Sequence, residues 1–219
     1  MNKTIANLLS IFFHPLTILT YMVIILLLLN PYLFGKNDVM QGWSMVLQVF
    51  FSTFCLPAMA VAMMKGLDLI SSFQMEDRKE RIIPYIATAT FYLWVFMTMR
   101  KNPSVPNVLT TAMLGSIIGI FISFFINNFS KISAHAVGIG GLIGLVMVAI
   151  RWYAYSYFYI NYFGQKIELG AYWVFIVCVL IGGLVCSARL WLKAHDLKDI
   201  GAGFAVGLIG QWAAFTFYA

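Results

Sequence analysis

Near the C-terminus, five charged side chains and a histidine fall within residues 187–199, in a chain of which only 10% of residues are charged. Three of these residues, Arg189, His195 and Asp199, suit phosphoryl transfer. His195 and Asp199 are four residues apart, so on a helix they lie one above the other. The carboxylate can then accept a proton from one ring nitrogen and leave the other nitrogen as a nucleophile. The planar guanidinium of Arg189 fits phosphate oxygens. The alternative is a solvated turn at a membrane surface.

A second polar segment, Ser133-Ala134-His135, precedes a glycine-rich apolar run. At the start of a helix, the serine hydroxyl and backbone N–H groups can hold an anion, and His135 could protonate a leaving oxygen as a general acid. The alternative is that Ser133 only caps the helix. Gly140 and Gly144 have the spacing of close helix packing, and we expect that role for them rather than chemistry.

A third polar segment contains two arginines, Arg78 and Arg81, in the run Asp77 to Arg81. On a helix these two arginines share a face and offer cationic donors to a phosphate. The sequence does not decide which of them would contact it. The alternative is that Asp77 and Glu80 simply pair with Lys79 and Arg81.

The elements that must position these segments are membrane spans. Of the 219 residues, 62% are hydrophobic, well above the share in soluble domains. A bilayer core of about 30 Å requires helices of about 20 apolar residues. Apolar runs of about this length cover 14–34, 41–64, 83–100, 107–127, 136–158, 170–190 and 200–218. We therefore predict an all-α, polytopic bundle of six or seven transmembrane helices, forming one domain over 1–219. The first run is too long for a cleaved signal peptide.

If the chain crosses the membrane seven times, the N-terminus and the three polar segments lie at the same membrane face. Ionisable residues in so apolar a chain are costly unless they line a cavity or meet water, so this face is the predicted functional site. The excess of cations on this face disappears when the candidate site residues are left out of the count. The positive-inside rule therefore leaves its sidedness open.

The motifs resemble those of the type 2 phosphatidic acid phosphatase superfamily of membrane lipid phosphatases. Arg189, His195 and Asp199 match its third signature, S-R-x5-H-x3-D, and Ser133-Ala134-His135 resembles its second, P-S-G-H. The first signature, K-x6-R-P, is replaced by the segment with Arg78 and Arg81, in which arginine and proline are not adjacent. The resemblance covers about residues 60–219.

This resemblance implies a metal-independent lipid phosphatase without a cofactor. His195 would form a phosphohistidine, Asp199 would orient it and His135 would protonate the leaving group. Arg189, Ser133 and one or both of Arg78 and Arg81 would bind the phosphate. The substrate would be a phosphate or diphosphate monoester of a lipid in the bilayer, and the protein would lie in a bacterial inner (plasma) membrane. Two alternatives remain open: a protein that binds or transports lipid phosphates without turnover, and a membrane scaffold.

Other residues carry weaker predictions. We expect Cys55, Cys178 and Cys186 to be buried thiols and His14 to be an interfacial anchor. Arg151 either snorkels to the interface or pairs with Glu168. His135 and His195 lack a third ligand other than Asp199, which argues against a metal site. The basic residues form no separate domain, which argues against a nucleic-acid partner. The oligomeric state stays open.

Overall fold

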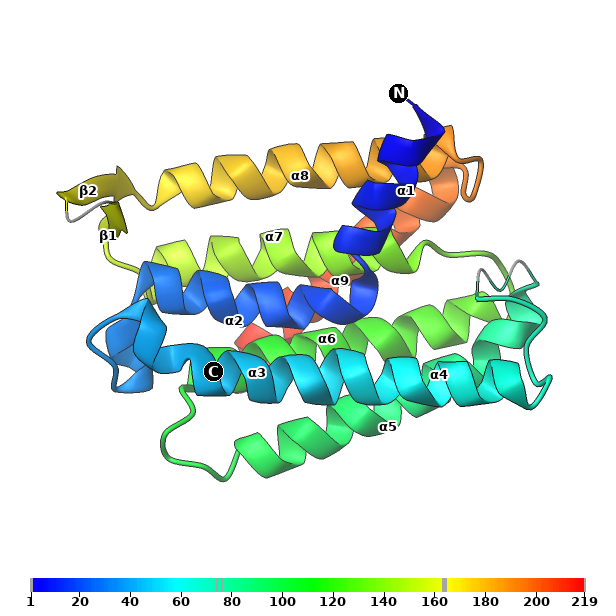
Figure 1. Ribbon diagram of the computed structural model, residues 1–219, viewed down its shortest axis with the longest axis horizontal. Helices are drawn as coiled ribbons and strands as arrows, with labels where there is room; N and C mark the ends of the chain where they lie inside the picture. The colour runs from blue at the N-terminus through cyan, green and yellow to red at the C-terminus, as the bar shows by residue number, and fades with distance from the viewer. Residues whose placement is uncertain (1, 74, 76, 163–164, 219) are drawn as a thin grey trace.

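A computed structural model describes residues 2–73, 75, 77–162 and 165–218, and it shows a helical bundle with one small β-hairpin at its end (Figure 1). In this part of the chain the α-helices are α1 (Lys3–Phe12), α2 (Ile18–Leu29), α3 (Trp43–Phe50), α4 (Leu56–Gly66), α5 (Ile82–Met99), α6 (Asn107–Asn127), α7 (Ala134–Trp152), α8 (Tyr172–Trp191) and α9 (Leu197–Tyr218). The strands are β1 (Tyr157–Tyr162) and β2 (Gln165–Gly170).

Seven helical segments in the described residues are long and apolar enough to cross a membrane. They run over Lys3–Leu29, Pro31–Gly66, Arg78–Met99, Asn107–Asn127, Ala134–Trp152, Tyr172–Trp191 and Leu197–Tyr218. The prediction of a polytopic integral membrane protein is therefore confirmed, with seven spans as the count. The boundaries of several spans were misplaced, each for a local reason.

The first span begins eleven residues earlier than predicted, at Lys3, and is bent in its middle. Asn2 caps α1 by accepting a hydrogen bond from the Thr4 N–H at 3.2 Å. The chain turns at His14 and Pro15, where a 3-10 helix of three residues joins α1 to α2. Figure 1 shows α1 tilted away from the axis of α2. The helix ends at Leu29 because Pro31 disfavours helical backbone at the residue before it, Asn30, whose ψ is 86°.

The second span is continuous but changes its winding. Between α3 and α4, residues Phe51–Cys55 form a π-helical turn. Pro57, in the first turn of α4, cannot donate a backbone hydrogen bond, and π-turns are frequent at functional sites. Phe54 of this turn points toward the α1–α2 bend, where its ring centroid lies 6.4 Å from that of His14.

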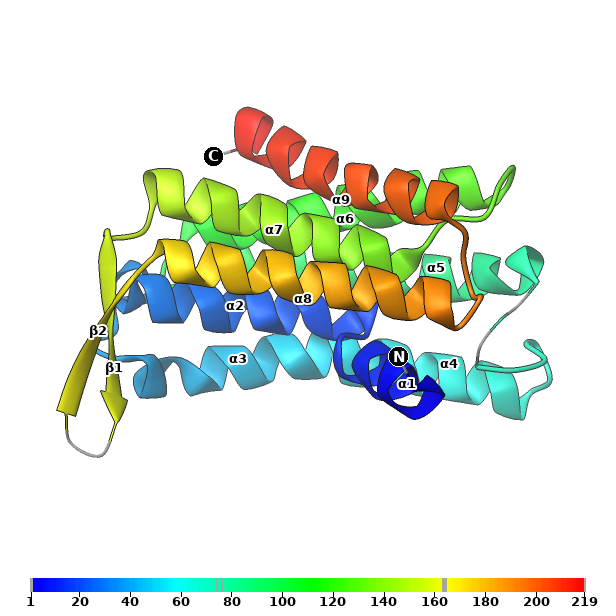
Figure 2. The same cartoon turned by 90° about the horizontal axis from the view of Figure 1, so that it is seen from above.

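The fifth predicted span, 136–158, was too long, because α7 ends at Trp152. The residues that follow pair as an antiparallel hairpin in which Tyr157 faces Gly170 and Tyr159 faces Glu168. This hairpin is an exception to the predicted all-α class. Figure 2 shows it extending from the bundle at the end where α7 stops and α8 starts.

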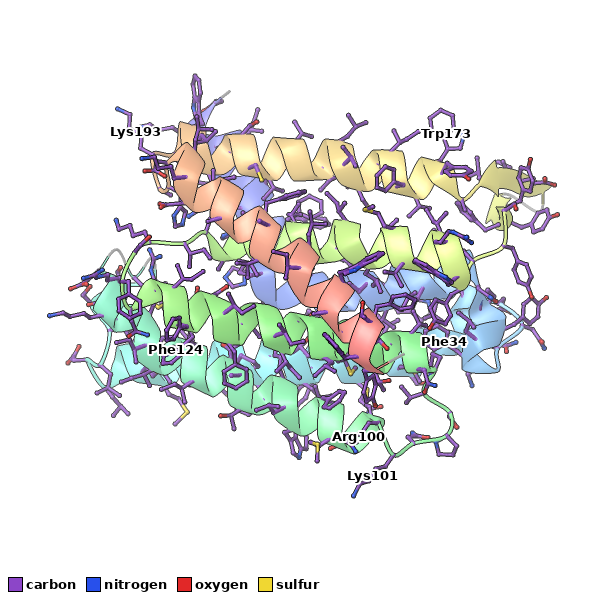
Figure 3. All side chains as sticks on the ribbon, turned by 180° about the vertical axis from the view of Figure 1, so that it is seen from behind. Phe34, Arg100, Lys101, Phe124, Trp173 and Lys193 are labelled. Carbon is purple, nitrogen blue, oxygen red and sulfur yellow. The ribbon has the colours of Figure 1, made fainter. Side chains whose placement is uncertain are left out.

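Helix α7 forms the centre of the bundle, where it packs against α2, α6, α8 and α9. Helices α7 and α9 pack very closely because each of them places glycines in the contact. A Cβ at Gly140 would overlap the carbonyl oxygen of Phe204, and a Cβ at Gly203 would lie 2.7 Å from that of Ser133. The expected packing role of Gly140 and Gly144 is therefore confirmed. Figure 3 shows α9 crossing obliquely over α6 and α7.

Exposed tryptophans lie at the hairpin end of the bundle (Figure 1). Trp43 begins α3, Trp152 ends α7 and Trp173 lies in the first turn of α8, and all three are exposed. The guanidinium carbon of Arg151 lies 5.5 Å from the Trp152 ring centroid, a cation–π contact that neither prediction for Arg151 included.

The cysteines agree only in part with the prediction of buried thiols. Cys178 is buried, whereas Cys55 and Cys186 are half-buried.

Candidate functional site

The three polar segments meet at the end of the bundle opposite the hairpin, as seven membrane crossings predicted. The α4–α5 connection, the α6–α7 connection and the α8–α9 turn all lie at this end, and α1 joins them there (Figures 1 and 2). Figure 3 places Lys193, in the α8–α9 turn, at the opposite end of the bundle from Trp173.

A cavity of about 510 Å³ opens from this end into the bundle. Two arginines and three histidines form what we call its polar end: His14, Arg81, His135, Arg189 and His195. Deeper in the bundle the lining becomes mainly apolar, with Leu19 and Met22 of α2 and Ile120 of α6, although Ser116 and Gln211 also contribute to it. Within the described part of the chain no aspartate or glutamate lines the cavity. The polar end therefore suits an anion, and the depth suits a hydrocarbon chain.

The α8–α9 turn positions His195 and Asp199 for nucleophilic chemistry. The Asp196 carboxylate accepts from the Asp199 N–H at 2.8 Å and so caps the start of α9. One turn along, the Asp199 carboxylate lies 3.1 Å from Nδ1 of His195, and the two side chains are only 14% and 5% exposed. A carboxylate accepts, so Nδ1 carries the proton and Nε2 keeps its lone pair. The predicted pairing of these two residues is present in the structure.

Burial lowers the pKa of His195 from its ordinary value near 6.5, although the hydrogen bond to Asp199 acts in the opposite direction. The cationic Arg189 and Arg81 contribute to the same lowering, because a second positive charge nearby is unfavourable. The ring is therefore neutral at pH 7, which is the form in which Nε2 can attack an electrophile.

His135 projects into the cavity from the first turn of α7, and its Nε2 lies 3.0 Å from the backbone carbonyl oxygen of Ser10 in α1. A carbonyl only accepts, so Nε2 carries a proton and Nδ1 is the nitrogen with a free lone pair in the neutral ring. Proton exchange with a ligand would therefore pass through Nδ1. The sequence did not predict a role for Ser10, which looks like an ordinary residue of an amphipathic helix.

Arg189 also contacts Ser10. One terminal nitrogen of its guanidinium donates to the Ser10 hydroxyl at 3.3 Å, and that hydroxyl donates to the Ala6 carbonyl at 2.9 Å. Among the described residues, the buried Nε of Arg189 has no hydrogen-bond partner. A guanidinium with unused donors at the wall of a cavity is a ready site for an oxyanion.

Of the two arginines in the 3-10 helix Arg78–Arg81 that precedes α5, only Arg81 lines the cavity. Its Nε donates to the Met75 carbonyl at 2.8 Å, which holds the side chain toward the polar end. Arg78 is exposed, and it donates to the carbonyl of Phe129 at 2.6 Å while its own carbonyl accepts from Asn127 at 2.8 Å. Arg78 thus joins the start of α5 to the end of α6.

The nearby carboxylates accept from backbone N–H groups in place of the predicted ion pairs. Asp77 accepts from the N–H of Lys79 at 2.9 Å, and Glu80 accepts from the N–H of Ser71 at 2.9 Å. These hydrogen bonds shape the loop before α5.

Ser133 has the structural role that the alternative prediction gave it. It is fully buried at the start of α7, where its hydroxyl accepts from the Ala136 N–H at 3.4 Å. Its own N–H donates to the backbone carbonyl of Asp199 at 3.3 Å. Ser133 therefore connects the segment of His135 to that of His195, but it does not line the cavity.

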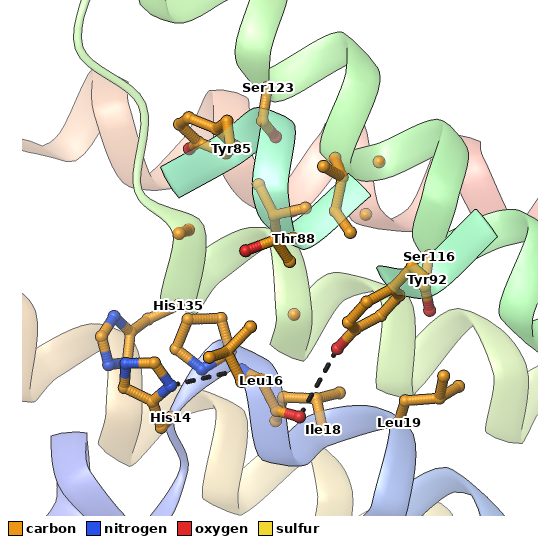
Figure 4. Close-up of a pocket in the computed structure, with 18 of the residues that line it drawn as sticks. His14, Leu16, Ile18, Leu19, Tyr85, Thr88, Tyr92, Ser116, Ser123 and His135 are labelled. Carbon is orange, nitrogen blue, oxygen red and sulfur yellow. Dashed lines mark hydrogen bonds between the residues drawn. The ribbon is translucent and has the colours of Figure 1, made fainter. Parts of the chain in front are cut away.

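His14 lies inside the cavity, and the prediction of an interfacial anchor is wrong. Its ring centroid is 5.7 Å from that of His135, with the ring planes nearly perpendicular (Figure 4). The chain bend at Pro15 brings the residue inward, because α1 leaves the axis of α2 at this point. A histidine before a proline in the middle of an apolar segment of 27 residues was the sign that could have identified it.

No family model matches this chain, and comparisons with curated proteins and with solved structures give no match either.

Proposed function

We propose that this integral membrane protein is a metal-independent phosphatase of lipid phosphates, and that it acts through a phosphohistidine at His195. The observation that supports this most is the buried His195–Asp199 pair at a cavity lined by arginines and histidines. The family resemblance of the motifs agrees with this proposal. The membrane would be a bacterial inner membrane, with the lipid phosphate and the bilayer as partners.

In the proposed reaction, Nε2 of His195 attacks phosphorus while the bond from phosphorus to the bridging oxygen breaks. The negative charge of the bound phosphate favours protonation of His135 at Nδ1, and His135 gives that proton to the departing oxygen. Water then attacks the phosphohistidine, His135 takes one proton from this water, and the products are inorganic phosphate and free His195. Arg189 and Arg81 stabilise the charge on the remaining phosphate oxygens. Asp199 holds the tautomer of His195 and stabilises its positive charge.

The apolar depth of the cavity gives the lipid chain a place within the bundle. Leu19, Met22 and Ile120 line that depth, while the headgroup would stay at the polar end. A small soluble phosphate ester would gain no binding energy from this part of the cavity, because it has no hydrocarbon chain to bury there. We therefore expect lipid phosphates to be better substrates than short soluble esters.

Release of inorganic phosphate from a panel of lipid phosphates tests the proposal. The purified protein in detergent is expected to release phosphate equally well with and without EDTA, and vanadate should inhibit it. If a lipid phosphate binds but no phosphate is released from any member of the panel, the protein is a binding or transport protein. If vanadate and all the lipid phosphates also fail to bind, the cavity is not a phosphate site.

Arg81 and Arg78 give a matched pair of variants. Arg81→Gln is expected to lower kcat/KM by about 10- to 100-fold, because it removes a charged donor to phosphate. Arg78→Gln should keep kcat/KM within about threefold, because its guanidinium bonds the Phe129 carbonyl outside the cavity. Phosphate-release kinetics on one lipid phosphate compare the two. Equal losses in both variants would contradict the placement of Arg81 as the phosphate ligand.

The lowered pKa of His195 sets the acid side of the pH profile. Attack requires the neutral ring, and protonation at low pH removes it. Because burial keeps the pKa below the ordinary value near 6.5, the decline in rate on the acid side should begin only below about pH 6.5. Rates of phosphohistidine formation between pH 4.5 and 8 measure this. A decline that begins above pH 7 would contradict a neutral His195.

A further inference from the structure

His14 is a titratable side chain of the polar end for which the proposed reaction has no role. It stands where the polar end gives way to the apolar depth, since Ile18, Leu19 and Met22 follow it along the chain and line that depth. Figure 4 shows its ring beside that of His135 and to the left of Ile18, the first residue of α2. A ligand that reaches from His195 into the apolar depth would pass close to it.

The backbone settles which nitrogen of His14 carries the proton. The Leu16 N–H donates to Nδ1 of His14 at 3.3 Å, so Nδ1 must hold a lone pair. In the neutral ring the proton is therefore on Nε2. Among the described residues this Nε2–H has no hydrogen-bond partner, although its neighbour His135 has one in the Ser10 carbonyl.

The charged side chains around His14 offer donors rather than acceptors. Arg81 and Arg189 are permanently charged donors, and the described lining of the cavity has no carboxylate. Asp199, the acceptor next to the cavity, is already bonded to His195. In the protonated form that the proposed reaction uses, His135 is a donor as well, so an anionic oxygen of a ligand is the acceptor that this cationic setting favours for His14.

We propose that His14 is a substrate-binding residue on the leaving-group side, and that its Nε2–H bonds the second phosphate of a lipid diphosphate. This inference rests on the proposed function. His135 would protonate the bridging oxygen, and His14 lies next to His135 on the side from which α2 begins. In a diphosphate, the atoms beyond the bridging oxygen are a phosphorus and its charged oxygens, whereas in a monophosphate a carbon follows. The hydrogen bond from His14 therefore favours a lipid diphosphate over the monophosphate with the same hydrocarbon chain.

Two variants separate this role from the part that His14 has in capping the turn. His14→Ser keeps a short acceptor for the Leu16 N–H but loses the donor that reaches the cavity. His14→Gln has an amide N–H with the reach of Nε2 but is a poor cap. The substrates are farnesyl diphosphate and farnesyl monophosphate, which share one hydrocarbon chain. Release of inorganic phosphate from each gives kcat/KM.

We expect His14→Ser to lower kcat/KM for the diphosphate by about 10- to 100-fold and for the monophosphate by less than about threefold. His14→Gln should recover most of the loss on the diphosphate. Equal losses on the two substrates, or a loss in the Gln variant with none in the Ser variant, would show that His14 only supports the turn and would overturn the inference.

A binding readout keeps this test separate from that of the proposed function. If the wild-type protein releases phosphate neither from these two substrates nor from any other member of the panel, the phosphatase proposal fails, and the role of His14 is then read from the unfolding midpoint in detergent. Farnesyl diphosphate should raise that midpoint more than farnesyl monophosphate does. His14→Ser should remove the difference and His14→Gln should keep it. Equal midpoints with the two lipids in the wild-type protein would overturn the inference.

Discussion

Protein carrying His195→Ala is expected to release phosphate from a lipid phosphate about 10⁴-fold more slowly than the wild type. The reason is that alanine removes Nε2, the atom proposed to form the bond to phosphorus, while the arginines that bind the substrate remain. Single-turnover phosphate release, with KM or binding affinity measured in parallel, checks this. Affinity should change little, since Arg189 and Arg81 still line the cavity.

Asp199→Asn is also expected to have a large effect, up to about 10⁴-fold, because the amide can donate to Nδ1 and hold the wrong tautomer, and it no longer stabilises a charged ring. Lys198→Ala is the control, since Lys198 is exposed on the same turn and does not line the cavity. It should retain the wild-type rate within about twofold. Substantial phosphate release by His195→Ala would exclude the phosphohistidine and would move the chemistry to another group of the polar end.

Gly207→Ala is expected to destabilise the protein by about 3 kcal/mol or more. Gly207 lies where α9 meets α7, and a Cβ there would overlap the backbone carbonyl of Val137 and meet backbone atoms of Gly140 and Gly141. Backbone cannot rotate away as a side chain can, so the two helices would have to separate. That separation would also move His135 relative to His195. The unfolding midpoint in detergent should fall, and phosphate release should fall with it.

Gly201→Ala on the same helix is the matched control. No atom lies within 4 Å of a Cβ built at Gly201, so alanine fits there and favours the helix by up to about 1 kcal/mol. Its midpoint should equal or exceed that of the wild type. If Gly207→Ala unfolds at the same temperature as Gly201→Ala, the close α7–α9 contact is not what holds the bundle together.

The sequence by itself determined the class of protein and limited the number of spans to six or seven. Apolar runs of about 20 residues dictate transmembrane helices regardless of their neighbours, because no backbone polar group can stay unpaired in hydrocarbon. Counting the spans then determined which polar segments share an end. The pairing of His195 with Asp199 was also predictable, because a spacing of four residues acts within one turn of one helix.

Only the tertiary structure decided which polar side chains reach the cavity. Arg78 and Arg81 have the same charge and lie three residues apart, and local loop hydrogen bonds turn one of them inward and the other outward. Ser10 and His14 come from the first span, and no periodicity links them to residues that follow more than 100 positions later. A bend at Pro15 and the packing of α1 against α8 bring them to His135 and Arg189, since such contacts depend on how helices pack and not on spacing along the chain.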